Sequence, residues 1–252
     1  MNLFRRLFSG KKEKKIDLTF PTSWQQLDAE QFRKICVILS LPGIGREQAL
    51  FLCLCALTSI RPDNPDKYDP KKIKGLQPFI INGQTHLVKA ADIATACGQM
   101  AFVYDTIGLT PSPFKKVDRM LYGKSFRQFF TADSYILRYG SDPNPAYLKE
   151  AAKVLTDGRI RKLLDWQRKA MVIWWNGLKD WMRMKYPYVF QPSEGSIGIS
   201  GKTQAEILQD LLSCMNDNKP QENEKILKTE VHQVLYSLNK IYEAHVNKRV
   251  SQ

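Results

Sequence analysis

The side chains of this 252-residue sequence that could do chemistry show none of the spacings that a catalytic or metal site needs. The three histidines, His86, His232 and His245, lie far apart, and the chain has no Cys-x-x-Cys pair. The five cysteines are scattered in mostly apolar surroundings, which predicts buried free thiols: Cys36, Cys53, Cys55, Cys97 and Cys214. We therefore expect no metal, no cofactor and no catalytic residues, in a chain that is not an enzyme.

One segment imitates a nucleotide-binding motif. Residues 195–203 read Gly-Ser-Ile-Gly-Ile-Ser-Gly-Lys-Thr, which ends like a phosphate-binding P-loop and leads into an expected helix. The motif requires a glycine at the position of Ser196, and a true P-loop also requires a buried strand before it. The apolar run before this segment is short and is closed by Pro192. We expect a loop here, with Thr203 as the cap of the next helix.

The net charge is strongly basic and unevenly placed. The chain has 38 Lys and Arg residues against 25 Asp and Glu, a net charge of +13. Residues 1–15 contribute +5 of this charge and residues 149–186 contribute +6, whereas the rest of the chain is nearly neutral. Such segments are typical of contacts with acidic proteins, nucleic acid or anionic surfaces.

The first basic segment is a candidate docking tail. Apolar residues surround an arginine pair and are followed by a lysine run, a pattern that suits contact with an anionic membrane surface, DNA or a groove on another protein. The alternative is a disordered tail that keeps the protein soluble. The candidate partner-binding residues of the tail are Leu3, Phe4, Arg5, Arg6, Leu7, Phe8, Lys11, Lys12, Lys14 and Lys15.

The second basic segment is predicted to form one long helix over residues 159–185. Trp174 shares a stripe with Leu and Met residues at helical spacing, which favours packing in the core, whereas Trp175, beside it, is the candidate for an exposed tryptophan. The basic residues mostly lie off this stripe. They form either a solvated helix face or a nucleic-acid surface on which tryptophan stacks against bases. The residues of this candidate basic surface are Arg161, Lys162, Arg168, Lys169, Lys179 and Arg183.

The hydrophobic pattern predicts a mainly α fold of about seven to eight helices with one small β-hairpin near residues 79–88. Asn82-Gly83 stands between two β-prone runs and predicts a two-residue turn. Ser125 and Gln128 form a capping box that begins a helix. No apolar run reaches the about 18 residues of a membrane span.

Changes in composition predict four parts along the chain. Residues 1–15 form the basic tail and residues 16–190 a helical body that contains the hairpin. A Ser-, Gly- and Pro-containing loop follows over residues 191–201, and residues 202–252 form a C-terminal helical pair packed on the body. No secretory signal begins the sequence, which predicts an intracellular protein.

Five segments in order along the chain are residues 20–32 (FPTSWQQLDAEQF), 126–133 (FRQFFTAD), 174–179 (WWNGLK), 186–190 (YPYVF) and the closing helix 231–242. Together they resemble an uncharacterised helical protein family of tailed phages and prophages of gut bacteria. The resemblance implies a virion structural protein, such as a tail or connector component, or a helical chaperone for tail assembly. It brings no catalytic residues.

The sequence thus predicts a non-enzymatic phage virion structural or assembly protein that acts by protein–protein contacts through a basic docking tail. It would reside in the virion or in the cytoplasm of the bacterial host. The expected partners are other virion or assembly proteins, with self-association and nucleic acid as secondary partners and no membrane span. The alternative is a nucleic-acid-binding module that uses the basic, Trp-rich helix 159–185.

Overall fold

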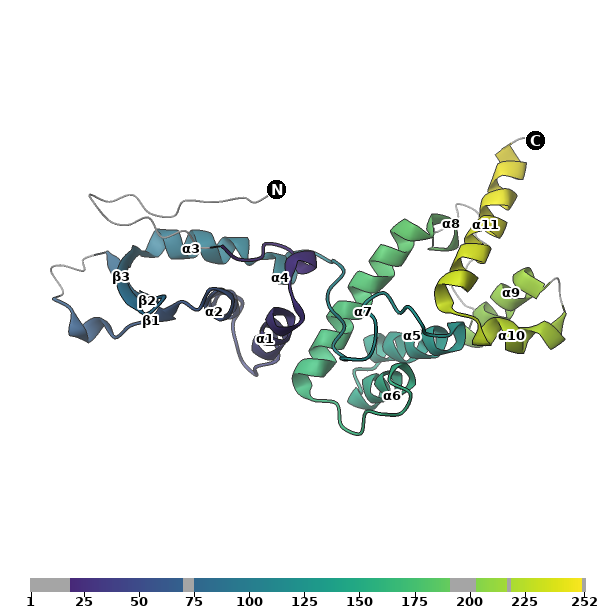
Figure 1. Ribbon diagram of the computed structural model, residues 1–252, viewed down its shortest axis with the longest axis horizontal. Coiled ribbons are helices and arrows are strands. Elements are labelled where there is room, and N and C mark those ends of the chain that lie inside the picture. The colour runs from purple at the N-terminus through teal and green to yellow at the C-terminus, as the bar shows by residue number, and fades with distance from the viewer. Residues whose placement is uncertain (1–18, 70–74, 191–202, 217–218, 251–252) are drawn as a thin grey trace. The chain divides into compact units, whose positions relative to one another are not determined.

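The chain folds into two compact units, which are described separately (Figure 1). The computed structural model describes residues 19–69, 75–190, 203–216 and 219–250. Unit 1 ends at Ile107 and unit 2 begins at Gly108, so the boundary lies inside the stretch 16–190 that the sequence suggested to be one body. The basic tail and the loop 191–201 lie outside the described residues.

The fold class is mainly α with a small three-stranded antiparallel sheet, which confirms the predicted class. Among the described helices, none combines the length and the apolar character that a membrane crossing requires. In unit 1 the elements are α1 (Ala29–Leu39), α2 (Arg46–Thr58), β1 (Arg61–Pro62), β2 (Leu76–Ile81), β3 (Gln84–Lys89), α3 (Ala90–Gln99) and α4 (Phe102–Asp105).

The predicted hairpin is confirmed in unit 1. Strands β2 and β3 pair antiparallel, and Asn82 and Gly83 connect them with φ angles of 51° and 78°. Two successive positive φ angles are what a tight hairpin turn of this kind requires, and Asn-Gly tolerates them. The apolar side of the sheet packs with the neighbouring helices in a small core: Ile60, Phe79, Ile81, Val88 and Ile93, with Phe51 and Cys97 against it.

In the described part of unit 2 the regular secondary structure is helical, with one isolated bridge between Ser125 and Glu230. Its capping box is confirmed, because the Ser125 side chain and the Gln128 side chain bind each other's backbone N–H groups. The elements of unit 2 are α5 (Phe126–Ser141), α6 (Pro145–Leu155), α7 (Asp165–Lys185), α8 (Pro187–Phe190), α9 (Gln204–Asn216), α10 (Asn223–Lys228) and α11 (Val231–Val250).

The prediction of one helix over residues 159–185 is wrong at its beginning. Helix α7 starts at Asp165, after Leu164 in an extended conformation with ψ of 158°. The Leu164 backbone N–H donates to the Gln167 side chain at 3.0 Å, which caps the helix at this point. Arg161 and Lys162 therefore lie in the segment before the helix and not on it.

Within residues 203–216 and 219–250, the C-terminal region holds three α-helices where a helical pair was expected. The break between α10 and α11 lies at Thr229, whose ψ of 148° is extended. The Thr229 carbonyl accepts from the Phe126 N–H at 2.8 Å, and the Val231 N–H donates to the Lys124 carbonyl at 2.9 Å. These backbone hydrogen bonds to the start of α5 require an extended segment, and they interrupt the helix.

The core of unit 2 is built on the two adjacent tryptophans of α7. Trp174 and Trp175 are 0 % and 2 % exposed, so Trp175, the candidate for an exposed tryptophan, is buried as well. The Trp175 ring stacks on Phe129 of α5, with ring centres 5.7 Å apart, and its Nε1–H donates to Asp133 at 2.8 Å. A polar partner inside the core lets this indole be buried without an unsatisfied donor.

Candidate docking pocket of unit 2

The cysteines divide between buried and exposed positions. Cys36 and Cys53 are buried, Cys55 and Cys97 are half-buried, and Cys214 is exposed, which corrects the expectation for Cys214. Burial raises the pKa of the Cys53 thiol to about 12 and that of Cys55 to about 11. At neutral pH these two thiols therefore stay protonated and are poor nucleophiles.

The six residues of the candidate basic surface do not act as one surface. Two of them are in ion pairs: Arg168 with Asp165, one turn away, and Lys179 with Asp133 of α5. The exposed ones are Arg161, Lys162, Lys169 and Arg183. The ten candidate residues of the tail lie outside the described part of the chain.

Lys179 belongs to a packed link between α5 and α7. Its ammonium group lies 2.8 Å from Asp133 Oδ2, and the side chains of Lys179 and Asp133 are only 20 % and 11 % exposed. The same ammonium lies above the rings of Phe129 and Phe190, 5.5 Å and 5.3 Å from their centres. This charge is neutralised and enclosed, so it is a structural contact and adds little to the surface potential.

The tryptophans are engaged in the core as well. Trp174 Nε1–H donates to the Arg119 carbonyl at 2.8 Å, and Phe114 packs edge-on against its ring. Base stacking needs an exposed aromatic face, which neither Trp174 nor Trp175 offers. The interpretation of α7 as a core helix is therefore the one that its burial supports.

His232 is also bound on both ring nitrogens. Nε2 lies 2.6 Å from the Met120 carbonyl, and Nδ1 lies 3.0 Å from the Tyr186 hydroxyl. Because a carbonyl only accepts, Nε2 carries the proton and Nδ1 accepts from Tyr186. Burial lowers the pKa of His232, against the opposing effects of the Met120 carbonyl and Glu230. Among the described residues, no group of three His, Cys, Asp or Glu side chains is placed to hold a metal ion.

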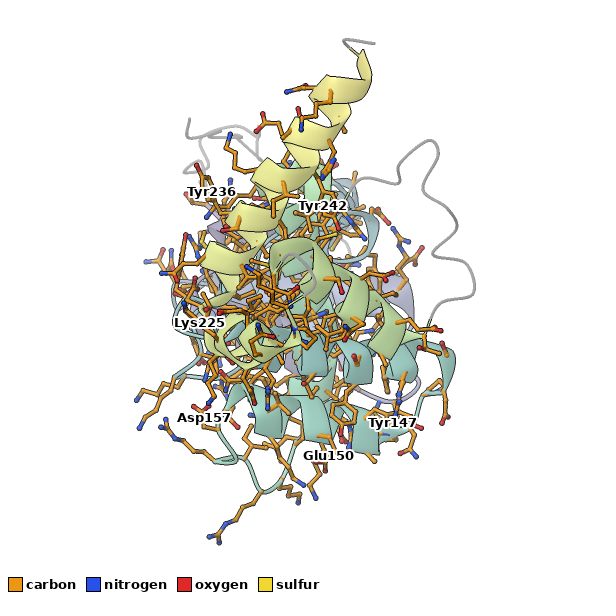
Figure 2. The ribbon with its side chains drawn as sticks, turned by 90° about the vertical axis from the view of Figure 1, so that its right-hand side faces the viewer. Tyr147, Glu150, Asp157, Lys225, Tyr236 and Tyr242 are labelled. Atoms are coloured by element: carbon orange, nitrogen blue, oxygen red, sulfur yellow. The ribbon has the colours of Figure 1, made fainter. Side chains whose placement is uncertain are left out.

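A cavity of about 320 Å³ opens in unit 2 between segments that are far apart in the sequence. Its walls come from the loop 113–117, from the end of α6 and the residues after it, and from the first turn of α7. The lining residues are Pro113, Phe114, Lys115, Lys116, Val117, Lys124, Leu155, Thr156, Asp157, Arg159, Ile160 and Gln167. Figure 2 shows Tyr147, Glu150 and Asp157 in a row along α6 and its C-terminal end.

An ion pair inside the cavity neutralises its one acid. Lys124 Nζ lies 2.9 Å from Asp157 Oδ2, and the Lys124 side chain is 10 % exposed. Gln128 donates to the other oxygen, Oδ1, at 2.6 Å. These contacts, with the charge of Arg159 nearby, hold the pKa of Asp157 below its usual value despite some burial. Asp157 therefore stays ionised at neutral pH and cancels the charge of Lys124.

Three cations of the pocket lining stand outside this ion pair. Lys115, Lys116 and Arg159 are exposed, and none of the three is in an ion pair within the part of the chain that the structure describes. We call these three residues the basic rim. The exposed residues Arg161 and Lys162 follow directly in the chain. The pocket thus combines an apolar interior with a positive edge, which suits a ligand that is apolar at one point and anionic around it.

Sequence reasoning missed most of this pocket. Lys115, Lys116 and Lys124 lie outside the two basic segments, and Arg159 was counted in the second segment without being assigned to the surface. The one local signal is the Lys-Lys pair after Phe114.

Comparison with protein-family models, with curated proteins and with solved structures finds no match to this chain.

Proposed function

We propose that the chain is a non-enzymatic phage virion structural or assembly protein, a tail or connector component or a tail assembly chaperone, that acts by protein–protein contacts. The observation that carries the proposal is the pocket of unit 2. There, Lys115 and Lys116 line the same apolar cavity as Arg159, which lies far away from them in the sequence. A positive edge around an apolar interior is the arrangement that docks an acidic partner protein.

The phage assignment is supported by the resemblance of the five segments and by the charge distribution. The basic tail, residues 1–15, is proposed as a second docking segment, in addition to the pocket of unit 2. Two weak basic contacts on one chain raise the overall affinity for an acidic assembly beyond that of either alone. The protein would act in the virion or in the cytoplasm of the bacterial host, with self-association as a further contact.

Nucleic acid binding through α7 is the weaker function. The two tryptophans that would stack on bases are buried, and Lys179 is neutralised by Asp133. A DNA titration at increasing salt tests this alternative with the full chain. Phosphate neutralisation would make the affinity fall steeply with salt. We expect weak binding that disappears at about 0.15 M salt.

The proposed function is tested by mass spectrometry of purified particles and of assembly intermediates from a host that produces them. We expect the wild-type protein in at least one of these preparations. The combined variant Lys115→Glu, Lys116→Glu and Arg159→Glu should be depleted there. The matched control Arg138→Glu, Lys149→Glu and Lys228→Glu reverses three exposed charges that do not line the pocket, and it should be retained. If wild-type protein is missing from both preparations, the proposal is wrong.

A further inference from the structure

We propose that the unit 2 pocket binds an acidic segment of a partner protein by taking up one apolar side chain, while carboxylates on either side of it contact Lys115, Lys116 and Arg159. This inference rests on the proposed function and specifies the chemistry of the partner. It follows from three properties of the pocket: the size of its cavity, the burial of its walls and the charge that remains at its rim.

The cavity is sized for a single residue. Its volume of about 320 Å³ is at the lower end of the range for ligand pockets, which is too small for an extended strand but sufficient for one large apolar side chain. The apolar lining comes from Phe114, Val117 and Leu155, which are at most 5 % exposed, and from the half-buried Ile160. Filling such a space removes the apolar surface of the entering side chain from water, together with the exposed part of Ile160.

The walls of the pocket are held in place by the core. The Phe114 ring packs edge-on against Trp174, with 6.3 Å between the ring centres, and Leu155 is fully buried at the end of α6. Ser112 and Phe114 also share a local hydrogen bond that shapes the loop. A pocket with fixed walls binds at a lower entropic cost than one that must form on binding.

The rim selects for carboxylates around the apolar anchor. Because Asp157 cancels Lys124, the positive charge of the rim belongs to three exposed side chains. Arg159 offers the planar fork that binds a carboxylate through two hydrogen bonds, and the two lysines add point charges. Phosphates of a nucleic acid would meet the same three charges, so the test below includes an oligonucleotide to distinguish the two kinds of partner.

The test is calorimetric titration of the full chain with acetylated and amidated pentapeptides at low salt. The first probe is Asp-Glu-Leu-Glu-Asp, the second has Ser in place of Leu, and the third is a thymidine oligonucleotide. We expect the Leu peptide to bind roughly tenfold more tightly than the Ser peptide, because only the Leu side chain fills the cavity. The Ile160→Ser variant should reduce this difference between the two peptides, since it removes part of the apolar wall.

The charge contribution is measured with neutral variants. The combined variant Lys115→Gln, Lys116→Gln and Arg159→Gln should bind the Leu peptide with an affinity that is lower by roughly tenfold or more. The control Arg138→Gln, Lys149→Gln and Lys228→Gln removes the same charge outside the pocket and should change the affinity by less than about twofold.

Three results would overturn the inference. The first is equal affinity for the Leu and Ser peptides, and the second is an equal loss of affinity for the Leu peptide in the rim and control variants. The third is displacement of the bound Leu peptide by the oligonucleotide at a lower concentration than the peptide itself needs to bind. Each of these leaves the particle experiment untouched. Loss of the rim variant from particles together with equal peptide affinities would retain the proposed function and reject only the apolar anchor.

Discussion

The ammonium group of Lys124 lies 2.9 Å from the carboxylate of Asp157, and this contact joins the loop before α5 to the end of α6. Asp157 adopts a left-handed conformation with φ of 55°, followed by Gly158 with φ of 76°. This reversal after α6 turns the Asp157 side chain back toward Lys124 and Gln128. The ion pair thus fixes the pocket geometry and sets its net charge at the same time.

The first prediction concerns the Asp157→Asn variant. Asn tolerates the left-handed conformation and keeps a hydrogen-bonding side chain, so the turn is retained. The negative charge is lost, and Lys124 is no longer cancelled. We expect the acidic Leu peptide to bind about two- to fivefold more tightly in calorimetry, with a loss of thermal stability because the largely buried Lys124 loses its anionic partner. Weaker binding would contradict the electrostatic account, because simple damage to the pocket has the opposite sign.

The second prediction concerns the close approach at Gly177 in α7. A Cβ atom at this position would collide with the Gly108 carbonyl group, whose carbon lies at 2.6 Å from the Cβ position. The obstacle is backbone, so the helix or the segment 108–109 must move. We expect Gly177→Ala to lower the free energy of unfolding of unit 2 by about 1–3 kcal/mol in urea denaturation.

Gly140 in α5 is the matched control for this prediction. It is a helical glycine of the same unit, and apart from its chain neighbours and the backbone of its own helix no heavy atom lies within 4 Å of its Cβ position. Gly140→Ala should raise stability by about 0.5 kcal/mol, since alanine restricts the unfolded chain and favours the helix. Equal effects of the two substitutions would show that backbone contact at Gly177 is unimportant.

The parts of the fold that were predicted correctly depend on short-range signals. The Asn82-Gly83 turn and the capping box of Ser125 and Gln128 each involve only a few consecutive residues, and both are present in the structure. The break at Thr229 was not predictable in this way. It depends on hydrogen bonds to the backbone at the start of α5, which is far away in the sequence.

Long-range packing also explains the errors at the candidate site. A helix places adjacent residues about 100° apart, which suggested that only one tryptophan of the pair faces the core. Trp175 is nevertheless buried, because Phe129 and Asp133 on α5 receive its ring and its N–H group. The pocket was not predicted for the same reason. Lys116 and Arg159 line one cavity only because the loop 113–117 packs near the end of α6.

The third prediction separates a structural role of Lys179 from a role in a basic surface. Lys179→Met keeps the length of the side chain but leaves Asp133 without its cation in a largely buried place. We expect a loss of about 2 kcal/mol in the free energy of unfolding, measured in urea, and no change in acidic peptide affinity. The control is Lys153→Met. The ion pair of Lys153 with Glu150 is exposed to solvent on both sides, so this variant should leave the free energy of unfolding nearly unchanged. Equal stability of the two variants would contradict the structural role.

The fourth prediction is a pH dependence caused by His232. Burial lowers the pKa of this side chain in the folded protein, so the unfolded chain, with a pKa of about 6.5, binds the proton more readily. Stability should therefore be constant above about pH 7 and should fall as the pH drops below about 6.5. Protonation of Nδ1 would also break the hydrogen bond that this atom accepts from Tyr186. Urea midpoints measured between pH 5 and pH 8 check this expectation.

Two variants isolate this effect from the titration of the acidic side chains. His232→Gln removes the titrating group and should flatten the stability profile between pH 5 and pH 7, at a lower absolute stability because the ring also contacts Trp181 and Tyr122. His245→Gln changes an exposed histidine on the same helix and should leave the profile as it is in the wild type. An unchanged slope in His232→Gln would assign the acid sensitivity to other groups, since a residue that no longer titrates cannot produce it.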